Sequence, residues 1–209
     1  MGPQPLVGAV FETAATATTN LPPPDVAEVA FAGRSNAGKS SAINALARHR
    51  GLAFASRTPG RTQQINFFRL RGGGRAVDLP GYGYAVVAKS LQREWQSFLW
   101  EYVQARSTLV GLVVVVDARH GVKPPDVDLI GAFAQSARPV LVLATKSDKL
   151  NNSDRRSAVT GIAAQLRALA LPVTPVVVGF SATDRAGVLE ADAVLAQWLP
   201  MPGGSTPDG

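Results

Sequence analysis

The first residues whose types and spacing could do chemistry form an eight-residue loop. They are Gly33, Arg34, Ser35, Asn36, Ala37, Gly38, Lys39 and Ser40. A short apolar run precedes this loop and a helical pattern that contains Ile43 and Leu46 follows it, which is the context of a phosphate-binding loop. Glycines let backbone N–H groups turn toward phosphate oxygens, and the start of the helix adds partial positive charge. We expect Lys39 to reach the β and γ phosphates of a nucleotide, and Ser40 to bind Mg²⁺ through its hydroxyl oxygen.

A second group of residues suits the same chemistry: Asp78, Leu79, Pro80 and Gly81 end an apolar run and enter a loop. An aspartate at such a strand end can hold Mg²⁺ through water, and a glycine three residues later can offer its backbone N–H to the γ-phosphate. The tetrapeptide is a weak signal by itself. It gains weight because it follows the phosphate loop at the interval that a helix, a loop and a hairpin would need.

The choice of base depends on Thr145, Lys146, Ser147 and Asp148, which follow the apolar run 140–144. The carboxylate of Asp148 can accept hydrogen bonds from N1–H and the 2-amino group of guanine, whereas adenine has no donor at those positions. Because a buried acceptor left unpaired costs about 1 to 3 kcal/mol, the pattern favours guanine. The aliphatic stem of Lys146 would pack along the base plane. Taken alone, these residues could also form only a turn and a helix cap.

A last loop, Phe180, Ser181 and Ala182, follows another apolar run, and its backbone is a candidate contact for the guanine O6 atom. Three residues are little evidence, and their value lies in their position. They complete the order of phosphate loop, magnesium aspartate, base reader and base-contact loop. An ATPase or a small-molecule kinase is an alternative that rests on the phosphate loop alone, and it predicts that ATP competes with GDP.

These loops need elements that bring them to one edge of a sheet. The apolar runs predict strands at 29–32, 65–70, 76–79, 109–116, 140–144 and 173–178. Apolar residues recur at spacings of three, four and seven from about Lys89 to Ala105, which predicts a helix. The segment 65–79 has three glycines in its middle and no helix, so we expect an antiparallel hairpin there. The predicted fold class is α/β, with three layers: a mostly parallel six-stranded sheet with one antiparallel edge strand, and helices on both faces.

The length of 209 residues fits one domain with tails. We expect an N-terminal leader at 1–24, a nucleotide-binding domain at 25–199 and a flexible C-terminal tail at 200–209. Cysteine is absent and only His49 and His120 are present, so thiol catalysis is excluded and a zinc site is not credible. The first 20 residues lack the features of a secretory signal, and the longest apolar run is far shorter than the ~20 residues that span a bilayer. A cytoplasmic protein with no membrane partner is expected.

The net charge of +6 is concentrated in one part of the sequence. Residues 29–77 contain no Asp or Glu. Their basic residues are Arg34, Lys39, Arg48, Arg50, Arg57, Arg61, Arg69, Arg71 and Arg75. Such an asymmetry indicates a polyanionic partner, for which nucleic acid is the usual candidate. A nucleotide pocket together with a solvated surface is the alternative explanation.

With these motifs in place, the chain resembles the translation-factor-like GTPases of the TrmE, Era, EngA, YihA and septin group, and within it the YihA/EngB (YsxC) family. The resemblance is carried by residues 33–40, 58–63 with 65–67, 78–84 and 145–148. It implies a G domain of the P-loop NTPase class that binds GTP, GDP and Mg²⁺. It also implies a first switch made of Gly60, Arg61, Thr62, Gln63 and Gln64.

The resemblance also settles two points that the residues alone leave open. Thr58 and Thr62 are both candidates for the second protein ligand to Mg²⁺, and the resemblance implies Thr62. Many GTPases have asparagine where this chain has Thr145, and the resemblance implies that threonine is normal for this family. It further implies that Asn36 holds a potassium ion that neutralises charge in the transition state, although a tolerated loop residue is an equal alternative.

The catalytic residues expected from this reading are Lys39, Asn36, Thr62 and Gly81. In many GTPases a glutamine directly after the Asp-x-x-Gly motif positions the attacking water, but here that residue is Tyr82. A phenol cannot do this in the same way, so we expect slow hydrolysis that a partner accelerates. Tyr82 is expected either to contact that partner or to pack against the domain.

The resemblance implies a bacterial GTPase that assists assembly of the large ribosomal subunit and is linked to cell division and septation. The expected partner is that subunit or its precursor, with its rRNA and proteins, and the protein itself is expected to be a monomer. The alternative is a nucleotide-dependent scaffold that acts on a cell-division protein without a ribosomal role. Sedimentation with ribosomal subunits separates the two.

Overall fold

A mostly parallel sheet of seven strands forms the centre of the computed structural model, which describes residues 2–54, 64–82 and 89–201, without the side chains of 89–96. The strands are β1 (Val10–Ala15), β2 (Glu28–Gly33), β3 (Ile65–Arg69), β4 (Arg75–Asp78), β5 (Leu109–Asp117), β6 (Val140–Thr145) and β7 (Val176–Gly179). Their order is β1-β3-β4-β2-β5-β6-β7. Strand β3 runs antiparallel to both of its neighbours, and the other pairs are parallel.

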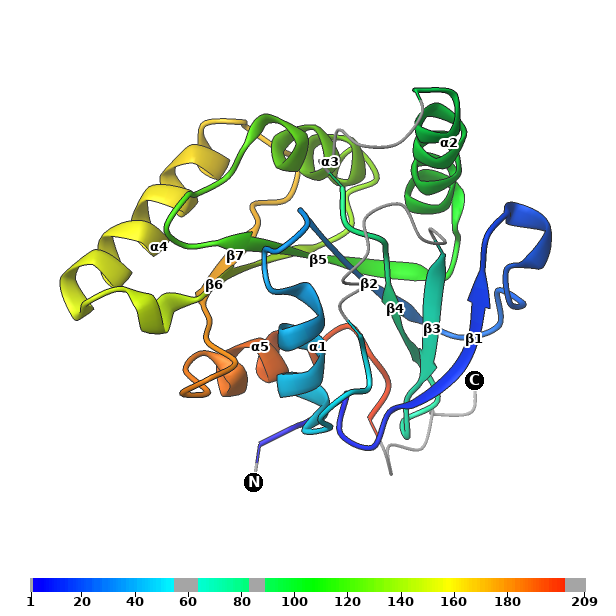
Figure 1. Ribbon diagram of the computed structural model, residues 1–209, viewed down its shortest axis with the longest axis horizontal. Coiled ribbons are helices and arrows are strands. Elements are labelled where there is room, and N and C mark those ends of the chain that lie inside the picture. The colour runs from blue at the N-terminus through cyan, green and yellow to red at the C-terminus, as the bar shows by residue number, and fades with distance from the viewer. Residues whose placement is uncertain (1, 55–63, 83–88, 202–209) are drawn as a thin grey trace.

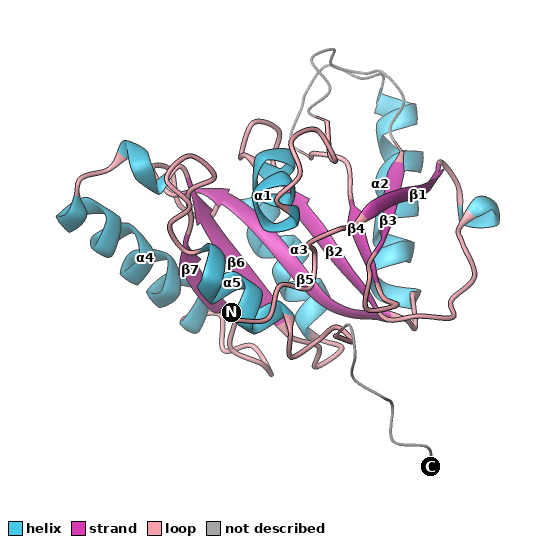
Figure 2. Ribbon diagram, turned by 90° about the horizontal axis from the view of Figure 1, so that it is seen from below, coloured by secondary structure: helices cyan, strands magenta, loops and turns pink. Residues whose placement is uncertain are grey.

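Helices cover both faces of this sheet and give the domain three layers. They are α1 (Lys39–Ala47), α2 (Lys89–Ala105), α3 (Pro124–Ala134), α4 (Asn152–Arg167) and α5 (Val188–Leu195), with short 3₁₀ turns η1 (Thr18–Asn20) and η2 (Ser147–Lys149). In Figure 1, α2, α3 and α4 lie above the sheet and α1 and α5 lie below it. Figure 2 looks from below and shows α1 and α5 in front of the strands. No helix in the described part of the chain is long and apolar enough to cross a membrane.

The two faces of the sheet build two hydrophobic cores from alternating residues of the same strands. On β5, Val113 and Val115 pack into the core of α1 and α5, whereas Val114 and Val116 pack into the core of α2, α3 and α4. All four side chains are nearly or fully buried. A strand covered on both faces needs apolar residues at every position, which explains the continuous apolar runs of β2, β5 and β6.

The predicted fold class is confirmed, and all six predicted strands are present, but the sheet has a seventh strand. Strand β1 lies in the segment 1–24, where only a leader was expected, and it pairs with β3. The antiparallel strand β3 is therefore second from the edge. Strand β1 escaped prediction because it is short, pairs on one side only and has just one buried residue, so its burial gives no strong pattern.

The observed bounds of α2 and β7 agree with the sequence prediction to different degrees. Helix α2 begins and ends where its apolar periodicity predicted. Strand β7 begins at Val176, three residues later than predicted. Pro175 precedes this start, and proline has no N–H to donate to a strand neighbour, so the ladder begins only after it.

A cluster of charged residues holds the sheet together at the end opposite the carboxyl ends of the parallel strands. Arg75, at the start of β4, donates hydrogen bonds to Glu12 at 2.9 and 3.1 Å, to Asp25 at 2.7 Å and to the Pro23 carbonyl at 3.0 Å. Its side chain is 6% exposed. Arg75 therefore fixes β1 and the segment after it against the sheet.

The same cluster reaches helix α2 through Glu28, a fully buried carboxylate on β2. Tyr102 of α2 donates to it at 2.9 Å, and Arg106, directly after α2, donates at 2.6 and 2.9 Å. Burial, followed by the charge of Glu28, raises the pKa of the Tyr102 hydroxyl well above its usual value. Arg106 also donates to the Pro22 carbonyl at 2.8 Å, so one guanidinium joins α2 to the N-terminal segment. We call Glu12, Asp25, Glu28, Arg75, Tyr102 and Arg106 the ion cluster.

Candidate nucleotide-binding site

The predicted phosphate loop connects β2 directly to α1. Gly33 is the last residue of β2, and Lys39 and Ser40 are the first two residues of α1, so the start of the helix points its free N–H groups into the loop. Gly38 caps the helix with φ at +99°, a conformation that residues with a side chain rarely adopt. Asn36 also has a positive φ, at +64°. The backbone therefore makes the curled turn that a phosphate cradle needs.

Asp78 lies beside this loop at the end of β4. It pairs in register with Phe31 of the parallel strand β2, and its side chain forms an ion pair with Lys39. The carboxylate is 6% and the ammonium 11% exposed, so the pair lies largely out of water. The structure thus brings together the predicted phosphate ligand and the predicted magnesium aspartate.

Gly81 and Tyr82 dock against the phosphate loop. A Cβ atom added to Gly81 would lie 2.8 Å from Ser35 Oγ and 3.3 Å from the Ser35 backbone nitrogen, so only glycine fits without a shift. The Ser35 N–H donates to the Tyr82 carbonyl at 3.1 Å, and the Tyr82 N–H donates to the Gly33 carbonyl at 3.3 Å. The segment that begins with Asp78, Leu79, Pro80 and Gly81 therefore touches the loop through its backbone.

The side chain of Tyr82 packs on the domain, which is one of the two alternatives that the sequence left open. Its hydroxyl donates to Asp126 of α3 at 2.7 Å, and the other carboxylate oxygen of Asp126 accepts from the Lys123 N–H at 2.9 Å. Burial, and then the charge of Asp126, raises the pKa of the Tyr82 hydroxyl. The phenol is committed to α3, so in this conformation it does not serve to orient a water.

Thr145, the last residue of β6, connects the base-reading loop to the phosphate loop. Its hydroxyl lies within hydrogen-bonding distance of the Ala37 carbonyl and of the Val116 carbonyl on β5, at 3.0 Å for the latter. The residue is only 4% exposed. A single buried hydroxyl therefore holds three segments in register, which gives a physical reason for a hydrogen-bonding residue at this position.

Lys146 crosses from the base-reading loop to the phosphate loop. Its ammonium donates to the Asn36 carbonyl at 2.6 Å and forms an ion pair with Asp117 at 2.9 Å. Arg119 donates to the same carboxylate at 2.7 and 2.9 Å. Burial alone would raise the pKa of Asp117, but these two cations outweigh it and hold that pKa well below its usual value. The ammonium of Lys146 is therefore fixed at both the phosphate loop and the end of β5.

Asp117, Arg119 and Asp126 were not predicted from the sequence. They line, with Arg34 and Lys146, a hollow of about 290 Å³ on the α3 side of the phosphate loop. Asp117 carried a usable signal, because it ends a buried strand at the same edge as Asp78 and Thr145. Asp126 carried none, since its partner Tyr82 is 44 residues away in the sequence.

Asp148 and the loop after β7 meet as predicted. The Ser181 hydroxyl donates to Asp148 at 2.8 Å, and the backbone N–H groups of Thr183 and Asp184 donate to that hydroxyl at 3.1 and 3.3 Å. The chain of hydrogen bonds orients the carboxylate, whose second oxygen lies 3.6 Å from Lys149 Nζ. This is the arrangement that a guanine-reading acceptor requires.

The other residues of these two loops contribute through their backbone. The Ser147 N–H donates to the Phe180 carbonyl at 3.2 Å. Ser147, Phe180 and Ser181 are fully buried, whereas Ala182 is exposed. The described part of the chain contains no group of three His, Asp or Glu side chains that could hold a metal ion.

The predicted first switch lies almost wholly outside the described residues. Gly60, Arg61, Thr62 and Gln63 fall in the gap between 54 and 64, as does Thr58. Gln64 is described, and its side-chain amide donates to Asn66 at 2.8 Å. The role of Thr62 as a magnesium ligand stays a prediction.

Taken together, a phosphate loop, a strand-end aspartate and the carboxylate of Asp148, oriented by Ser181, lie at the carboxyl ends of the parallel strands, where ligands of α/β folds bind. This combination of fold and site defines a P-loop GTPase. A family model described as "50S ribosome-binding GTPase" matches residues 28–146.

Known proteins agree with this class. The chain is 46% identical over 199 residues to a probable GTP-binding protein EngB of Aromatoleum aromaticum, covering 95% of this chain and 91% of the relative. It is 44% identical to a protein of the same name in Neisseria meningitidis, over 82% of each chain. The chain belongs to the EngB family of GTP-binding proteins, and it is a GTPase.

Solved structures share the fold. A crystal structure of a probable GTP-binding protein engB matches with a TM-score of 0.66 at 22% identity, over 82% of this chain and 97% of that one. Era in complex with MgGDPNP and nucleotides of 16S ribosomal RNA matches with a TM-score of 0.64 at 21% identity, over 87% of this chain and 59% of that one.

Proposed function

We propose that this GTPase is a GTP-driven switch in assembly of the large ribosomal subunit, and that its loss disturbs cell division and septation through that role. The observation that carries the proposal is the match of residues 28–146 to a family described as 50S ribosome-binding GTPases. The excess of arginine in residues 29–77 supports a partner rich in phosphate. Such a role belongs in the cytoplasm.

Magnesium is the metal that the site would use. The Ser40 hydroxyl lies at the start of α1, next to the Lys39–Asp78 pair. Hydroxyl and carboxylate oxygens are hard donors, and the absence of a His or Asp/Glu cluster from the described residues suits an ion that keeps waters and phosphate oxygens as ligands. Held by Ser40, Mg²⁺ would neutralise charge on the bound phosphates. Lys39 would then leave Asp78 for phosphate, which frees that carboxylate to hold a magnesium-bound water.

Hydrolysis is expected to be slow until a partner acts. The phenol of Tyr82 stands where many GTPases have the glutamine that orients water, and it donates to Asp126 on α3. A partner that orders the switches, with Gln63 or Gln64 nearby, would supply the missing orientation. Stimulation of GTP hydrolysis by the large subunit is therefore expected, and equal rates with and without it would contradict this step.

Potassium is proposed as a second cation, held through Asn36 in the phosphate loop. Its positive φ gives the loop a turn that directs backbone groups toward the phosphates. The test compares hydrolysis in KCl with hydrolysis in NaCl at equal ionic strength, with Asn36→Ala as the matched variant. Equal rates in the two salts would remove any role for potassium.

The ribosomal role is tested by sedimentation of the full chain with purified 50S or 30S subunits in the presence of a non-hydrolysable GTP analogue, GDP or no nucleotide. We expect the GTP-analogue form to sediment with 50S and not with 30S, and the GDP form to be released. If the GTP-analogue form ignores 50S at moderate salt but captures a septal protein, the alternative of a division scaffold replaces this proposal.

A further inference from the structure

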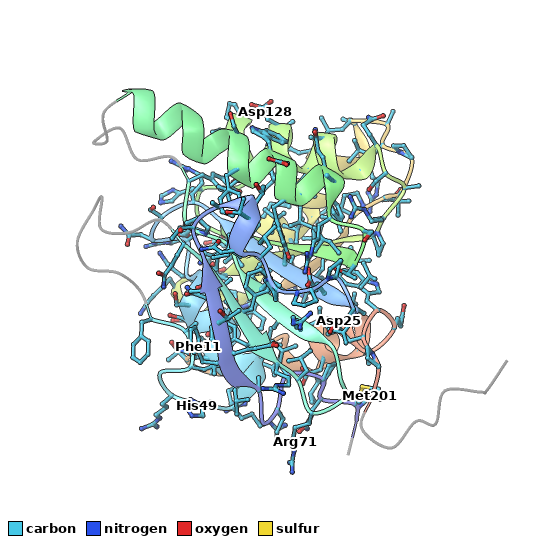
Figure 3. All side chains as sticks on the ribbon, turned by 90° about the vertical axis from the view of Figure 1, so that its right-hand side faces the viewer. Phe11, Asp25, His49, Arg71, Asp128 and Met201 are labelled. Atoms are coloured by element: carbon cyan, nitrogen blue, oxygen red, sulfur yellow. The ribbon has the colours of Figure 1, made fainter. Side chains whose placement is uncertain are left out.

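A basic surface lies at the far end of α1 from the nucleotide site. Arg48 and Arg50 follow the last turn of α1, and Arg71 lies in the turn between β3 and β4. All three side chains are exposed, and none forms an ion pair with any residue in the described ranges. Phe11, His49 and Arg71 lie along the same lower rim of the molecule in Figure 3.

Two exposed aromatic rings belong to segments next to these arginines in the chain or sheet: Phe11 lies on β1, which pairs with β3, and Phe54 follows Arg50 by four residues. Phe11 on the edge strand β1 is 58% exposed, although its ring contacts Phe68 at 6.1 Å between centroids. Phe54 is 80% exposed. Its loop is tied to α1, because the Asn44 side chain makes two hydrogen bonds with the backbone of Ala53, at 2.7 and 2.9 Å. Rings exposed to this extent are accessible for stacking on the unpaired bases of a nucleic acid.

The segments that carry this surface pack into the same hydrophobic core. Leu6 and Ala9, before β1, belong to the same hydrophobic core as Leu46 of α1 and Phe68 of β3. The Arg71 side chain lies against Gly8, where a Cβ atom would come within 2.4 Å of its Cδ atom. We call Phe11, Arg48, Arg50, Phe54 and Arg71 the edge patch.

Acidic groups do not neutralise the edge patch. Residues 29–77 contain no Asp or Glu. The carboxylates nearest in the fold are already engaged or buried: Glu12 accepts from Arg75, and Asp192 on α5 is 1% exposed. The charge of Arg48 acts on the buried Asp192. Arg50 and Arg71 form no ion pair within the described ranges, so their charges act on solvent and on any partner.

We propose that the edge patch is a docking surface for single-stranded or looped RNA; the source of that RNA, a ribosomal precursor, rests on the proposed function. Arginines bind phosphates, and exposed phenylalanines stack on unpaired bases, which is the combination by which proteins hold single strands. A protein partner would instead favour a patch whose centre is poor in charge. The edge patch combines three exposed arginines with two exposed rings, so the chemistry fits a nucleic acid better.

The position of the edge patch leaves the nucleotide site open. Helix α1 has nine residues, which gives it a length of about 13 Å, with Lys39 and Ser40 at one end and the arginines beyond the other. RNA on the patch would thus contact the far end of the helix that carries the phosphate ligands. A single rigid element connects the two sites.

The test measures binding of a fluorescein-labelled single-stranded RNA of about 20 nucleotides by anisotropy, with the full GDP-bound chain at several KCl concentrations. In the double variant Arg50→Ala with Arg71→Ala, we expect binding at least about tenfold weaker, and a salt dependence of log K that is shallower by about 1.4. In Phe11→Ala we expect binding at least about fivefold weaker with an unchanged salt slope. The matched control is Arg156→Ala, an exposed arginine on the outer face of α4, which should bind RNA as the parent does.

Affinity for fluorescent GDP and the melting temperature show that each variant is folded. If folded patch variants bind RNA as tightly as Arg156→Ala, or if the parent binds no RNA, the inference is wrong. Sedimentation with 50S subunits separates this failure from that of the proposed function. If the parent and the patch variants sediment equally with 50S, only the inference about the edge patch is wrong.

If RNA binding depends on the patch but the protein does not bind 50S, the inference about the edge patch is supported and the proposed ribosomal function is wrong. Loss of 50S binding in variants of a parent that ignores free RNA indicates a protein contact and overturns the inference.

Discussion

The two ends of the central sheet are built by different physical means. At the carboxyl ends of the parallel strands, hydrogen bonds such as those from Thr145 and Ser181 join the loops of the nucleotide site. The ion pairs there, such as Lys39–Asp78, involve a residue that would turn to the nucleotide when it binds. At the opposite end, the ion cluster ties β1, β2, β4 and α2 together through charged side chains that are mostly buried. The first end has to open and close around a ligand, while the second has to stay fixed. The comparison indicates that the fold concentrates its permanent ties away from its chemistry.

Removing the central carboxylate of the ion cluster should give the largest effect on stability. In Glu28→Ala, Arg106 and Tyr102 lose a fully buried partner. We expect the free energy of unfolding to fall by about 3 to 5 kcal/mol, because an uncompensated buried charge remains. Urea unfolding followed by circular dichroism measures this. Glu101→Ala, on the exposed side of α2, is the matched control and should change stability little. If Glu28→Ala loses little free energy of unfolding, the ion cluster does not stabilise its end of the sheet as the comparison requires.

Changing the base reader should affect binding and leave stability nearly unchanged. Asp148→Asn replaces an acceptor with an amide that also donates. We therefore expect the affinity for GDP to fall by about 100-fold, or ~2.7 kcal/mol, and the affinity for xanthine nucleotides to rise. Calorimetry measures the affinities, with Asp128→Asn on the exposed face of α3 as the control. ATP should not compete in either variant. Unchanged preference for guanine in Asp148→Asn would show that this carboxylate does not read the base.

Two buried carboxylates differ in their partners. Glu28 lies within 4 Å of Arg75, Arg106 and Tyr102, whereas Asp192 on α5 has no hydrogen-bond partner among the described residues. Burial raises the pKa of this carboxyl from 3.8 to about 6, although Arg48 and Arg185 act against that rise. The unfolded chain ionises at lower pH than the folded one, so Asp192 reduces stability progressively between about pH 4 and pH 6, and fully above that.

Asp192→Asn should therefore stabilise the protein at high pH. At about pH 8 we expect a gain of roughly 1 to 3 kcal/mol, and at about pH 5 a clearly smaller one. Urea unfolding at the two pH values measures the difference. Glu190→Gln, exposed on the same helix, should give no pH-dependent gain. An equal effect at both pH values would mean that the carboxyl of Asp192 does not titrate in this range.

The smallest effect is expected from the hydroxyl of Thr145. Thr145→Val keeps the shape of the side chain but removes its hydrogen bonds to the Ala37 and Val116 carbonyls. We expect a loss of about 1 to 2 kcal/mol in stability and weaker GDP binding, because the two loops lose their connection. Thermal melts and nucleotide titration measure these changes, and Thr145→Ser should restore both. Full activity and stability in the valine variant would show that the loops hold each other by other means.

The sequence by itself determined the fold class, six of the seven strands and the order of the nucleotide loops. These features are local, because a buried strand needs a continuous apolar run and a phosphate loop needs glycines at fixed spacing. Asp148 also follows a predicted strand, β6, and its role as base reader stays a prediction. The presence of the family's motifs added the first switch, of which Gly60, Arg61, Thr62 and Gln63 lie outside the described residues.

Only the tertiary structure decided which distant residues meet. Tyr82 reaches Asp126, Lys146 reaches Asp117, and Arg75 reaches Glu12 and Asp25, and each pair is joined by chain packing rather than by sequence spacing. Strand β1 likewise depends on β3 for its hydrogen bonds, so its own residues do not reveal it. A local sequence pattern predicts the helix, strand or loop that it stabilises. An ion pair or an edge strand forms only where the fold brings a distant partner into contact.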